Sequence, residues 1–542
     1  MARLDRLGPA KEIAQVGAVI GSEFSYELLH AVHPLDETEM QEALRRLADV
    51  ELIYIHGIAP KASYTFKHAL VRDAAYEALL KSRRKELHRL VAQTIDDRFP
   101  ALKETRPEVL ARHWMEAGEI SPALNAWARA GTVAEMRHAF SEARESYHQA
   151  LLLLDLLPAS PERDQRELEL RRALILVLAV TRGDAAIERI QAAERTASLA
   201  EKSGNLKHLA MAVNVRCYSA YVAGDLRIAA ALANKALELA LREGAPVSLA
   251  TAHHLQLIAR WSRGDLAGVE QHFTAGASLF QHTDFRQQPG GVAVSAFGVA
   301  SLNALLRGWA DVARQRMARV MAIANEHNPY DVAWSGYFAA TLNLRLREYE
   351  RAEALAARSI ELSEKNQFPQ VAAYSRLTLG QAQVHLGRAS EGITLIRRAT
   401  AGFLEVGNNV SAPHRTLALA VALEQEGRIT EALETVRDAL RANPDELMSR
   451  PEALRLLGEL SLKNADSGLA EANFRDAIAL AKEIEAKTWQ LRATTSLARL
   501  LRGTNRRDEA RAMLAEIYNW FTEGFDTADL KDAKALLDEL SW

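Results

Sequence analysis

Few residues of this 542-residue chain have the types and spacing that catalysis or metal binding requires. His253 and His254 are adjacent, so on a helix their side chains point about 100° apart and do not form a chelating pair. Cys217 is the only cysteine, which excludes an internal disulfide and cysteine-rich metal sites, and we expect it to pack as a small apolar residue. No Gly-Lys pair, His-Glu-x-x-His helix or Gly-x-Ser-x-Gly elbow is present. We therefore expect a protein that is not an enzyme, with no catalytic residue, metal or cofactor.

Aromatic and hydrogen-bonding side chains that recur on expected helices are better candidates for binding. Gathered on one concave surface, such side chains suit the capture of a peptide or a small ligand. For any single residue the alternative is that the ring packs between helices as core. The candidate groove residues are Asn214, Tyr218, Tyr221, Thr251, His254, Trp261, Trp334, Tyr337, Tyr374 and Gln381.

A repeat with a period near 40 residues places these side chains. A short turn followed by a helix start recurs nine times, from Gly183 to Gly503, at spacings of 36 to 44 residues. A small residue follows five positions after most turns, which lets two helices of a hairpin approach closely. The regular turns argue against one long coiled coil and predict a solenoid of about nine or ten helical hairpins over residues 136–542. The small residues are Ala229, Ala313, Ala352, Gly392, Ala432 and Ala472.

The unit around Gly387 resembles the tetratricopeptide repeat. Leu379-Gly380 matches the Leu-Gly pair of its first helix, Gly392 its small second-helix position and Ala399 its later alanine. The usual unit has about 34 residues, and the longer period here is similar to the arrays of bacterial signal-transduction regulators. The resemblance implies an all-α fold, a right-handed α-solenoid, whose groove binds a protein or peptide partner or a small effector.

The first 135 residues do not follow this period. Helices are expected over residues 10–19, 24–32 and 37–50, the last capped by Asp36, followed by two β-like stretches at 52–56 and 63–66. This is the order of a winged helix, which predicts a winged-helix-like domain over residues 1–80 and connecting helices over 81–135. The third helix carries five acidic against two basic residues, so nucleic acid is not an expected partner, although a transcriptional regulator is an alternative.

The segment from Tyr64 to Tyr76 resembles the end of the winged-helix domain in signal-transduction ATPases, in particular those linked to class III adenylate or guanylate cyclases. The segment from Leu7 to Phe24 is similar to the start of that domain. The resemblance implies that His68, with Arg72, senses ADP held by an adjoining ATPase domain, although Ala69 replaces an acidic residue of relatives. The alternative is that His68 only caps a helix.

What the resemblance implies for the whole chain is a regulatory role. The chain would be a non-catalytic interaction module and the C-terminal part of a larger protein, since it starts directly at the winged helix. Alternatively, it would be the control region of a cyclase that makes a cyclic nucleotide. In both cases ATP or ADP would act only through an ATPase domain absent from this chain.

Composition limits the remaining classes. Hydrophobic residues make up 48% and charged residues 25%, which is enough to bury a large core. The formal charge of −3 gives no general attraction to nucleic acid or acidic lipid. The longest apolar run, residues 173–180, is far shorter than the roughly 20 residues of a spanning helix, and no signal peptide precedes it. We expect a cytoplasmic protein without a membrane partner.

Overall fold

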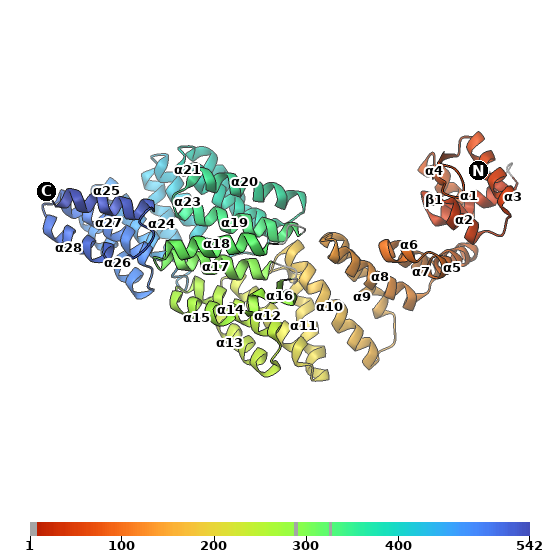
Figure 1. The fold of residues 1–542 in the computed structure, drawn as a ribbon, viewed down its shortest axis with the longest axis horizontal. Coiled ribbons are helices and arrows are strands. Elements are labelled where there is room, and N and C mark those ends of the chain that lie inside the picture. Colours follow the sequence, from red (N-terminus) through yellow and green to blue (C-terminus); the bar gives the residue numbers. More distant parts are fainter. Residues whose placement is uncertain (1–7, 287–290, 325–327, 542) are drawn as a thin grey trace. The chain divides into compact units, whose positions relative to one another are not determined.

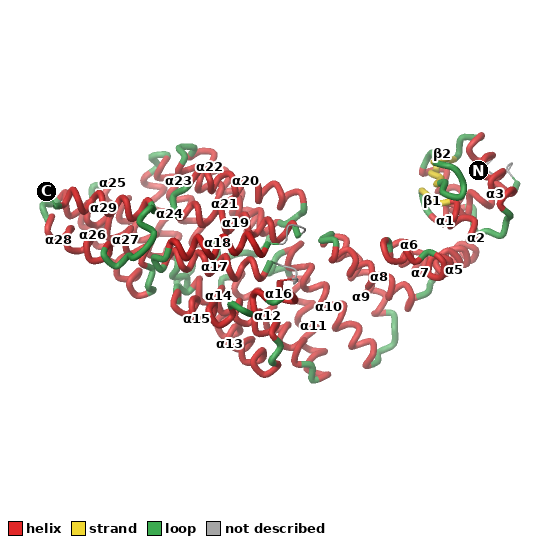
Figure 2. Tube along the Cα trace, viewed as in Figure 1, coloured by secondary structure: helices red, strands yellow, loops and turns green. Residues whose placement is uncertain are grey.

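The computed structural model describes residues 8–286, 291–324 and 328–541. This part of the chain is almost entirely helical, with three short strands near its N-terminal end (Figures 1 and 2). It divides into two compact units, Met1–Leu174 and Ile175–Trp542, and the division falls inside helix α10 (Pro161–Arg182). The prediction of an all-α solenoid is confirmed for the second unit, which consists of paired helices.

The first unit begins with the predicted three helices and hairpin. Asp36 caps the third helix by accepting a hydrogen bond from the Glu39 backbone nitrogen at 2.9 Å. A three-residue strand was missed; it pairs with the second hairpin strand, so the sheet order is β1-β3-β2. Phe24 of this strand stacks on Tyr64 with ring centroids 5.6 Å apart and anchors the small core. The elements are α1 (Pro9–Ile20), β1 (Glu23–Ser25), α2 (Tyr26–Val32), α3 (Glu37–Asp49), β2 (Ile53–His56) and β3 (Ser63–Phe66).

Six further helices follow in the first unit before α10. His88 on α5 and His113 on α7 face each other inside the unit, with their Nδ1 atoms 2.9 Å apart. α8 and α9 form a hairpin in which Gly131 leaves room for Tyr147, because a Cβ on Gly131 would lie 2.4 Å from the ring. The helices are α4 (Ala69–Glu77), α5 (Lys81–Arg98), α6 (Pro100–Thr105), α7 (Pro107–Ala117), α8 (Ile120–Met136) and α9 (Phe140–Asp155).

The second unit stacks its hairpins side by side, as Figure 1 shows. In each hairpin we call the first helix A and the second helix B; the A helices are α10 and the even-numbered α12 and α14, then the odd-numbered α17 to α27. A short 3-10 helix (Leu279–Gln281) and α16 (Thr283–Arg286) interrupt the series before α17, where the turn spacing widens to 44 residues. The other elements are α11 (Ile187–Ser203), α12 (Leu206–Ala223), α13 (Leu226–Glu243), α14 (Pro246–Ser262), α15 (Leu266–Gly276), α17 (Val292–Leu306), α18 (Ala310–Ile323), α19 (Pro329–Arg345), α20 (Tyr349–Lys365), α21 (Pro369–His385), α22 (Ala389–Glu405), α23 (Ala412–Gln425), α24 (Ile429–Ala442), α25 (Arg450–Lys463), α26 (Ser467–Glu483), α27 (Lys487–Gly503), α28 (Arg507–Tyr518) and α29 (Ala528–Leu540).

The predicted turns coincide with left-handed backbone at most hairpins. Glycines at six of the nine turns have φ between 74° and 93°, and Arg347 takes this conformation at a seventh. The last two turns were misplaced, because Ala465 and Asn505 adopt positive φ and the predicted turn residues 467 and 503 are helical. Ala472 is consequently exposed, and Ala470 is the buried small residue of that hairpin.

The array coils back on itself, so hairpin turns contact loops roughly 200 residues further along the chain. The Val222 carbonyl accepts hydrogen bonds from the backbone nitrogens of Asn409 and Val410, at 2.7 and 3.0 Å. Thr488 Oγ1 donates to the Leu305 carbonyl at 2.5 Å across 183 residues of sequence. We call this line of contacts the seam. The array is therefore a superhelix whose successive turns touch.

Glycines at the seam serve a second purpose besides their backbone conformation. A Cβ on Gly308 would lie 2.6 Å from the Trp520 ring and 2.9 Å from Phe521. A Cβ on Gly387, which has a similar φ of 83°, would meet nothing within 4 Å. Close contact between superhelical turns therefore requires glycine at the first position but not at the second.

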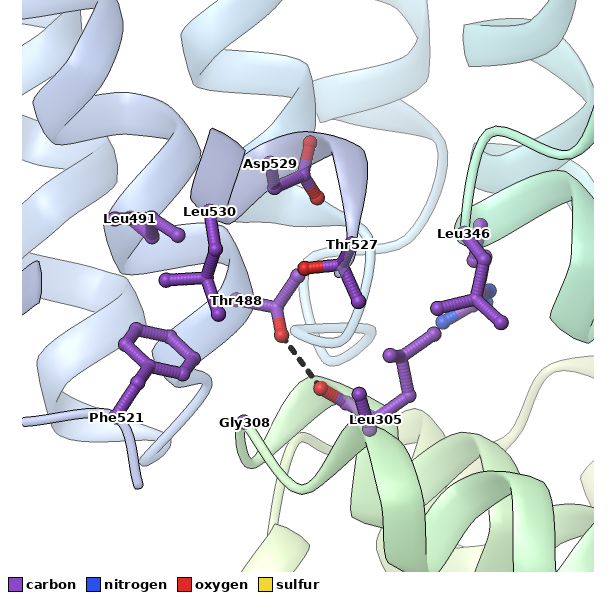
Figure 3. Close-up of a pocket in the computed structure, with 11 residues that line it drawn as sticks. Leu305, Gly308, Leu346, Thr488, Leu491, Phe521, Thr527, Asp529 and Leu530 are labelled. Carbon is purple, nitrogen blue, oxygen red and sulfur yellow. Dashed lines mark hydrogen bonds between the residues drawn. The ribbon is translucent and has the colours of Figure 1, made fainter. Parts of the chain in front are cut away.

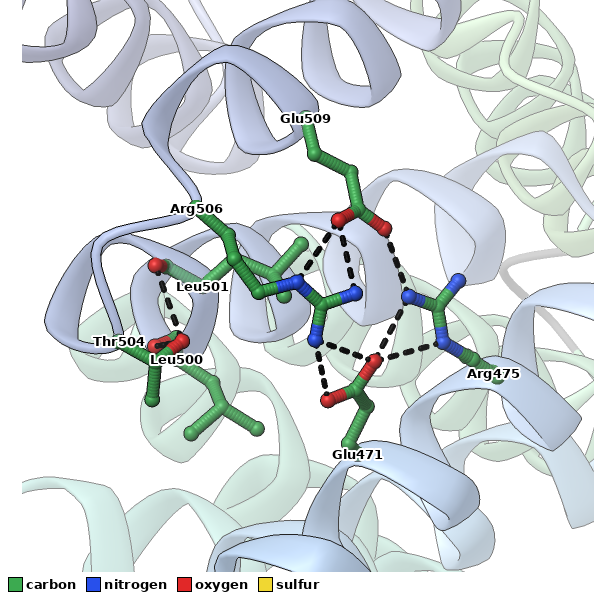
Figure 4. Close-up of polar contacts among 7 residues, drawn as sticks. All are labelled: Glu471, Arg475, Leu500, Leu501, Thr504, Arg506 and Glu509. Carbon is green, nitrogen blue, oxygen red and sulfur yellow. Dashed lines mark hydrogen bonds and ion pairs between the residues drawn. The ribbon is translucent and has the colours of Figure 1, made fainter.

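Exposed ion pairs join the last hairpins. Arg475 of α26 and Arg506 before α28 each contact both Glu471 and Glu509, with distances of 2.7 to 3.0 Å (Figure 4). Salt screens such exposed pairs, so they set the register of neighbouring helices more than they add stability.

None of the described helices is both long and apolar enough to cross a membrane.

Candidate functional site

Aromatic side chains from A helices converge inside the superhelix. The Trp334 and Tyr337 ring centroids on α19 lie 5.4 Å apart, and both rings contact Tyr374 of α21, at 5.6 and 5.1 Å. These three residues are half-buried, so each keeps some solvent-accessible surface. Tyr374 is fixed in place because its hydroxyl accepts hydrogen bonds from Asn408 Nδ2 and Ser411 Oγ, at 3.0 and 3.1 Å. We call Trp334, Tyr337 and Tyr374 the aromatic wall.

A polar chain lies on the neighbouring A helices. His254 is fully buried between Tyr218 and Ser295, with His254 Nδ1 bonded to the tyrosine hydroxyl and Nε2 2.9 Å from Ser295 Oγ. Burial lowers the pKa of His254 to about 3, so its ring is neutral at physiological pH. A neutral imidazole has one donor and one acceptor nitrogen, and both are used here.

Arg345 extends the same face of α19 beyond the aromatic wall. Its guanidinium lies 5.6 Å from the Trp261 ring and 5.8 Å from the Trp489 ring, which belong to different superhelical turns. Tyr221 is nearby, half-buried, and accepts a hydrogen bond from Ser262 Oγ at 3.3 Å. Side chains from A helices far apart in the sequence therefore face one interior.

The structure brings seven of the ten predicted groove residues into this interior and keeps them close together. Of the other three, Thr251 and Gln381 donate hydrogen bonds to carbonyls of their own helices, and Asn214 lies half-buried on α12. Of the seven, His254 and Trp261 are buried, Trp261 within the hydrophobic core, which is the alternative stated for single residues, whereas the other five are half-buried. The seven are Tyr218, Tyr221, His254, Trp261, Trp334, Tyr337 and Tyr374.

Sequence reasoning missed Arg345, Arg415 and Trp489. The signal for Arg345 was present, because it follows Trp334 at the 3.6-residue period through Thr341. Trp489 comes from a helix more than 200 residues away from Trp261, and no local pattern connects the two. Glu446 was also missed; it is buried in a loop, and burial raises the pKa of its carboxyl to about 7.

A small pocket opens at the seam (Figure 3). Leu305, Gly308 and Leu346 line one side, and Thr488, Phe521 and Asp529 line the other. Asp529 is already paired with Arg492 at 2.7 Å, and Thr488 with the Leu305 carbonyl. Asp529 and Thr488 are therefore satisfied within the protein, whereas Arg345, which also lines this pocket, has an Nη1 atom without a hydrogen-bond partner.

The predicted nucleotide-sensing residues lie in the first unit. His68 is exposed at the residue before α4, where its backbone carbonyl accepts the first helical hydrogen bonds and its side chain makes no capping bond. Arg72, one helical turn later, forms an ion pair with Asp73 at 2.5 Å. Their proposed role stays a prediction.

The remaining candidates for chemistry are structural in this fold. Cys217 is fully buried, as expected, and its thiol donates to the Ala229 carbonyl at 3.3 Å. His253 turns away from His254 and meets His272 instead, with Nδ1 atoms 3.1 Å apart. Within the described ranges, no three His, Cys, Asp or Glu side chains gather as a metal site.

Comparisons with known proteins give a curated relative and a number of solved structures, two of which are described below. No protein-family model matches the chain. An uncharacterized protein of Rhizobium meliloti (strain 1021) is 22% identical over 453 residues, which cover 81% of this chain and 43% of that protein. The chain thus spans less than half the length of this relative.

Two of the similar solved structures have low sequence identity to this chain. A chain of the APC/C hetero-tetramer Cut9-Hcn1 is 14% identical with a TM-score of 0.49, covering 85% of this chain and 84% of that chain. NprR in complex with its cognate peptide NprX is 13% identical with a TM-score of 0.38, covering 53% of this chain and 81% of that chain.

Proposed function

We propose that this chain is a non-catalytic interaction module whose superhelix binds a polypeptide partner along the aromatic wall. The observation that carries the proposal is the convergence of half-buried rings from α19 and α21 on one interior face. Rings that only filled a core would be fully buried, as Phe403 beneath Tyr374 is. Exposed aromatic area inside a repeat array is typical of a binding surface.

A polypeptide suits this face better than a compact apolar ligand. Tyrosine and tryptophan offer large contact areas at a low cost in side-chain entropy and also hydrogen-bond through their polar ends. Tyr221 and Ser295 are half-buried residues of the same interior, and the hydroxyl of each can form a further hydrogen bond with a backbone amide of an extended chain. Alternating apolar and polar contacts are what such a chain presents.

The test is selection of binding peptides by the full chain, followed by measured affinities. Random peptides of about twelve residues are displayed on phage, and selected sequences are synthesised for fluorescence anisotropy. The variant Trp334→Leu/Tyr337→Leu should bind them at least about 30-fold more weakly, the loss typical of hot-spot aromatic residues. The control Leu241→Ala/Leu404→Ala removes exposed side chains of the B helices α13 and α22 and should bind as the wild type does.

Equal binding by both double variants would refute the assignment of the aromatic wall. Failure of any peptide to be enriched would refute polypeptide binding itself. Circular dichroism of each variant establishes that the helices are retained, so a loss of affinity is not a loss of fold.

A second candidate function concerns the first unit. We propose that it regulates a signal-transduction ATPase, and what supports this is the resemblance of residues 64–76 together with the exposure of His68 at the start of α4. Under this proposal the complete protein is longer than the chain, and the solenoid passes partner binding to the ATPase. Mixing the chain with the ATPase domain of such a protein should slow ADP release, His68→Ala should abolish that effect and His56→Ala should not.

A further inference from the structure

The interior of the superhelix holds a positive charge that the protein does not neutralise. Arg345 ends α19, and its Nη1 atom is enclosed yet has no hydrogen-bond partner. Its other terminal nitrogen, Nη2, meets only the Met448 sulfur at 3.9 Å. Among the residues that the structure describes, no carboxylate lies within 4.0 Å of this guanidinium. An enclosed guanidinium nitrogen without a partner loses its hydration without compensation, which destabilises the fold.

Nearby carboxylates are held by other donors. Glu446 accepts hydrogen bonds from the Ser449 backbone nitrogen at 3.2 Å and hydroxyl at 2.6 Å. Glu452 pairs with Arg455 at 2.7 Å. The charge of Arg345 still reaches its surroundings, because after burial it is the second cause that lowers the pKa of His414, to about 4. Arg345 therefore acts as an unsatisfied cation inside the array.

A second arginine lies on the other side of the aromatic wall. Arg415 on α23 is buried, donates to the Asn408 carbonyl at 2.9 Å and lies 5.8 Å from the Phe403 ring. Within the described part of the chain it too has no carboxylate within 4.0 Å. Burial lowers the pKa of both guanidiniums, that of Arg345 to about 10, and the neighbouring Tyr337 and Tyr374 offset part of the shift at Arg345 and Arg415 respectively. This part of the interior is complementary to a negatively charged group.

We propose that Arg345 binds a carboxylate group of the peptide partner, which lies against the rings of Tyr337 and Tyr374. The inference rests on the proposed function and names the chemistry that the site selects. A guanidinium fork matches a carboxylate with two parallel hydrogen bonds, and the enclosed position makes each bond stronger than it would be in water. The two tryptophans on either side of Arg345 hold the fork in one orientation. Arg415 already donates to the Asn408 carbonyl, so the unpartnered donor is on Arg345 alone. One guanidinium balances the single charge of a carboxylate, whereas a phosphate normally draws several donors.

The test compares peptides and protein variants in pairs. Selected acidic peptides are measured beside copies with an amidated C-terminus and copies with Asn or Gln in place of Asp or Glu, so that the two sources of a carboxylate are separated. Arg345→Gln should weaken binding of the acidic peptide by about 10- to 100-fold, the effect of losing a charge-assisted hydrogen bond. It should leave the affinity of the neutralised copy unchanged. Arg345→Lys, which retains the charge, should recover part of the loss, and Arg437→Gln, on the exposed face of α24, should change nothing.

Three outcomes would overturn the inference. Equal loss for acidic and neutralised peptides would show that Arg345 supports the fold rather than the ligand. Unchanged affinity in Arg345→Gln, or preference for a phosphopeptide over the acidic peptide, would show that the carboxylate is not what this arginine recognises. In these cases peptide binding itself stands. If the wild type selects no peptide, both the inference and the proposed function fail.

Discussion

The seam between superhelical turns gives the sharpest prediction, because two glycines with the same backbone conformation differ in what surrounds them. Gly308 and Gly387 have φ of 93° and 83°. A new Cβ at Gly308 would lie 2.6 Å from Trp520 and 2.9 Å from Phe521, while the same atom at Gly387 would meet nothing within 4 Å. Gly308→Ala and Gly387→Ala therefore both place alanine in a left-handed backbone conformation, but only Gly308→Ala also places a Cβ against aromatic rings.

The shared cost comes from the left-handed backbone. Alanine in this conformation destabilises by about 1 kcal/mol relative to glycine, partly offset by the lower entropy of the unfolded chain. Gly308→Ala adds overpacking against two rings, of which Phe521 is buried, at about 1–3 kcal/mol. We expect a loss of about 1 kcal/mol for Gly387→Ala and about 2–4 kcal/mol for Gly308→Ala.

Hydrogen exchange measured by mass spectrometry localises this loss. A repeat array does not unfold in one step, so a single free energy of unfolding describes it poorly. Local stability lost at the seam speeds exchange about tenfold for each 1.4 kcal/mol. In Gly308→Ala, faster exchange is expected in segments 484–488 and 519–527, which contact this turn, and in Gly387→Ala neither segment should change.

Equal rates of hydrogen exchange at both segments in the two variants would refute the claim that Gly308 packs against the later superhelical turn. Faster exchange in Gly308→Ala that is confined to its own hairpin would show that the turn does not transmit the clash to the later superhelical turn. Circular dichroism of both variants verifies that the helical content is preserved.

Substitutions at three further positions should change the stability of the fold in a direction that the structure predicts. Gly458→Ala should lower stability by about 1–3 kcal/mol, because a Cβ there would lie 2.5 Å from Phe474, whereas Gly468→Ala, with nothing closer than 3.8 Å, should not lower it in chemical denaturation. His254 is neutral in the fold, where its pKa is about 3, but it gains a proton in the unfolded chain below about pH 6.5. The free energy of unfolding of the wild type therefore falls as the pH falls below 6.5. In His254→Gln this fall between pH 6.5 and 4 should be smaller, by up to about 1.4 kcal/mol per pH unit. The carboxyl of Glu446 ionises at a higher pH when folded, near 7, than when unfolded, so stability falls as pH rises from about 4.5 to 7. Glu446→Gln should therefore be more stable than the wild type at pH 8 in urea titrations, and a less stable variant would contradict this.

The helical repeat could be predicted because its causes are local. Turn glycines such as Gly224 and Gly427 adopt positive φ in place, and small residues such as Ala229 pack within their own hairpin. The last two turns were misplaced because Ala465 and Asn505 take the left-handed conformation without glycine. Asparagine is a known alternative to glycine at such positions, whereas alanine gives no signal for one. The strand around Phe24 was missed because three residues are too few for a period to register.

The candidate site could be predicted only in outline. The repeat period places Trp334, Tyr337 and Tyr374 on A helices, and all three face one interior. That Arg345 lacks a partner, by contrast, depends on which carboxylates come near it and which donors hold those carboxylates.

The sequence by itself determined that helices pair into hairpins and that the pairs stack, since hydrogen bonds and side-chain contacts within 40 residues are enough for both. Only the tertiary structure decided that the array closes on itself along the seam, with Gly308 pressed against Trp520 and Arg345 enclosed between Trp261 and Trp489. These contacts join residues 84 (261 to 345), 144 (345 to 489) and 212 (308 to 520) positions apart. They depend on the small rotation from each hairpin to the next summed over several repeats. The accumulated rotation cannot be predicted from a short stretch of sequence.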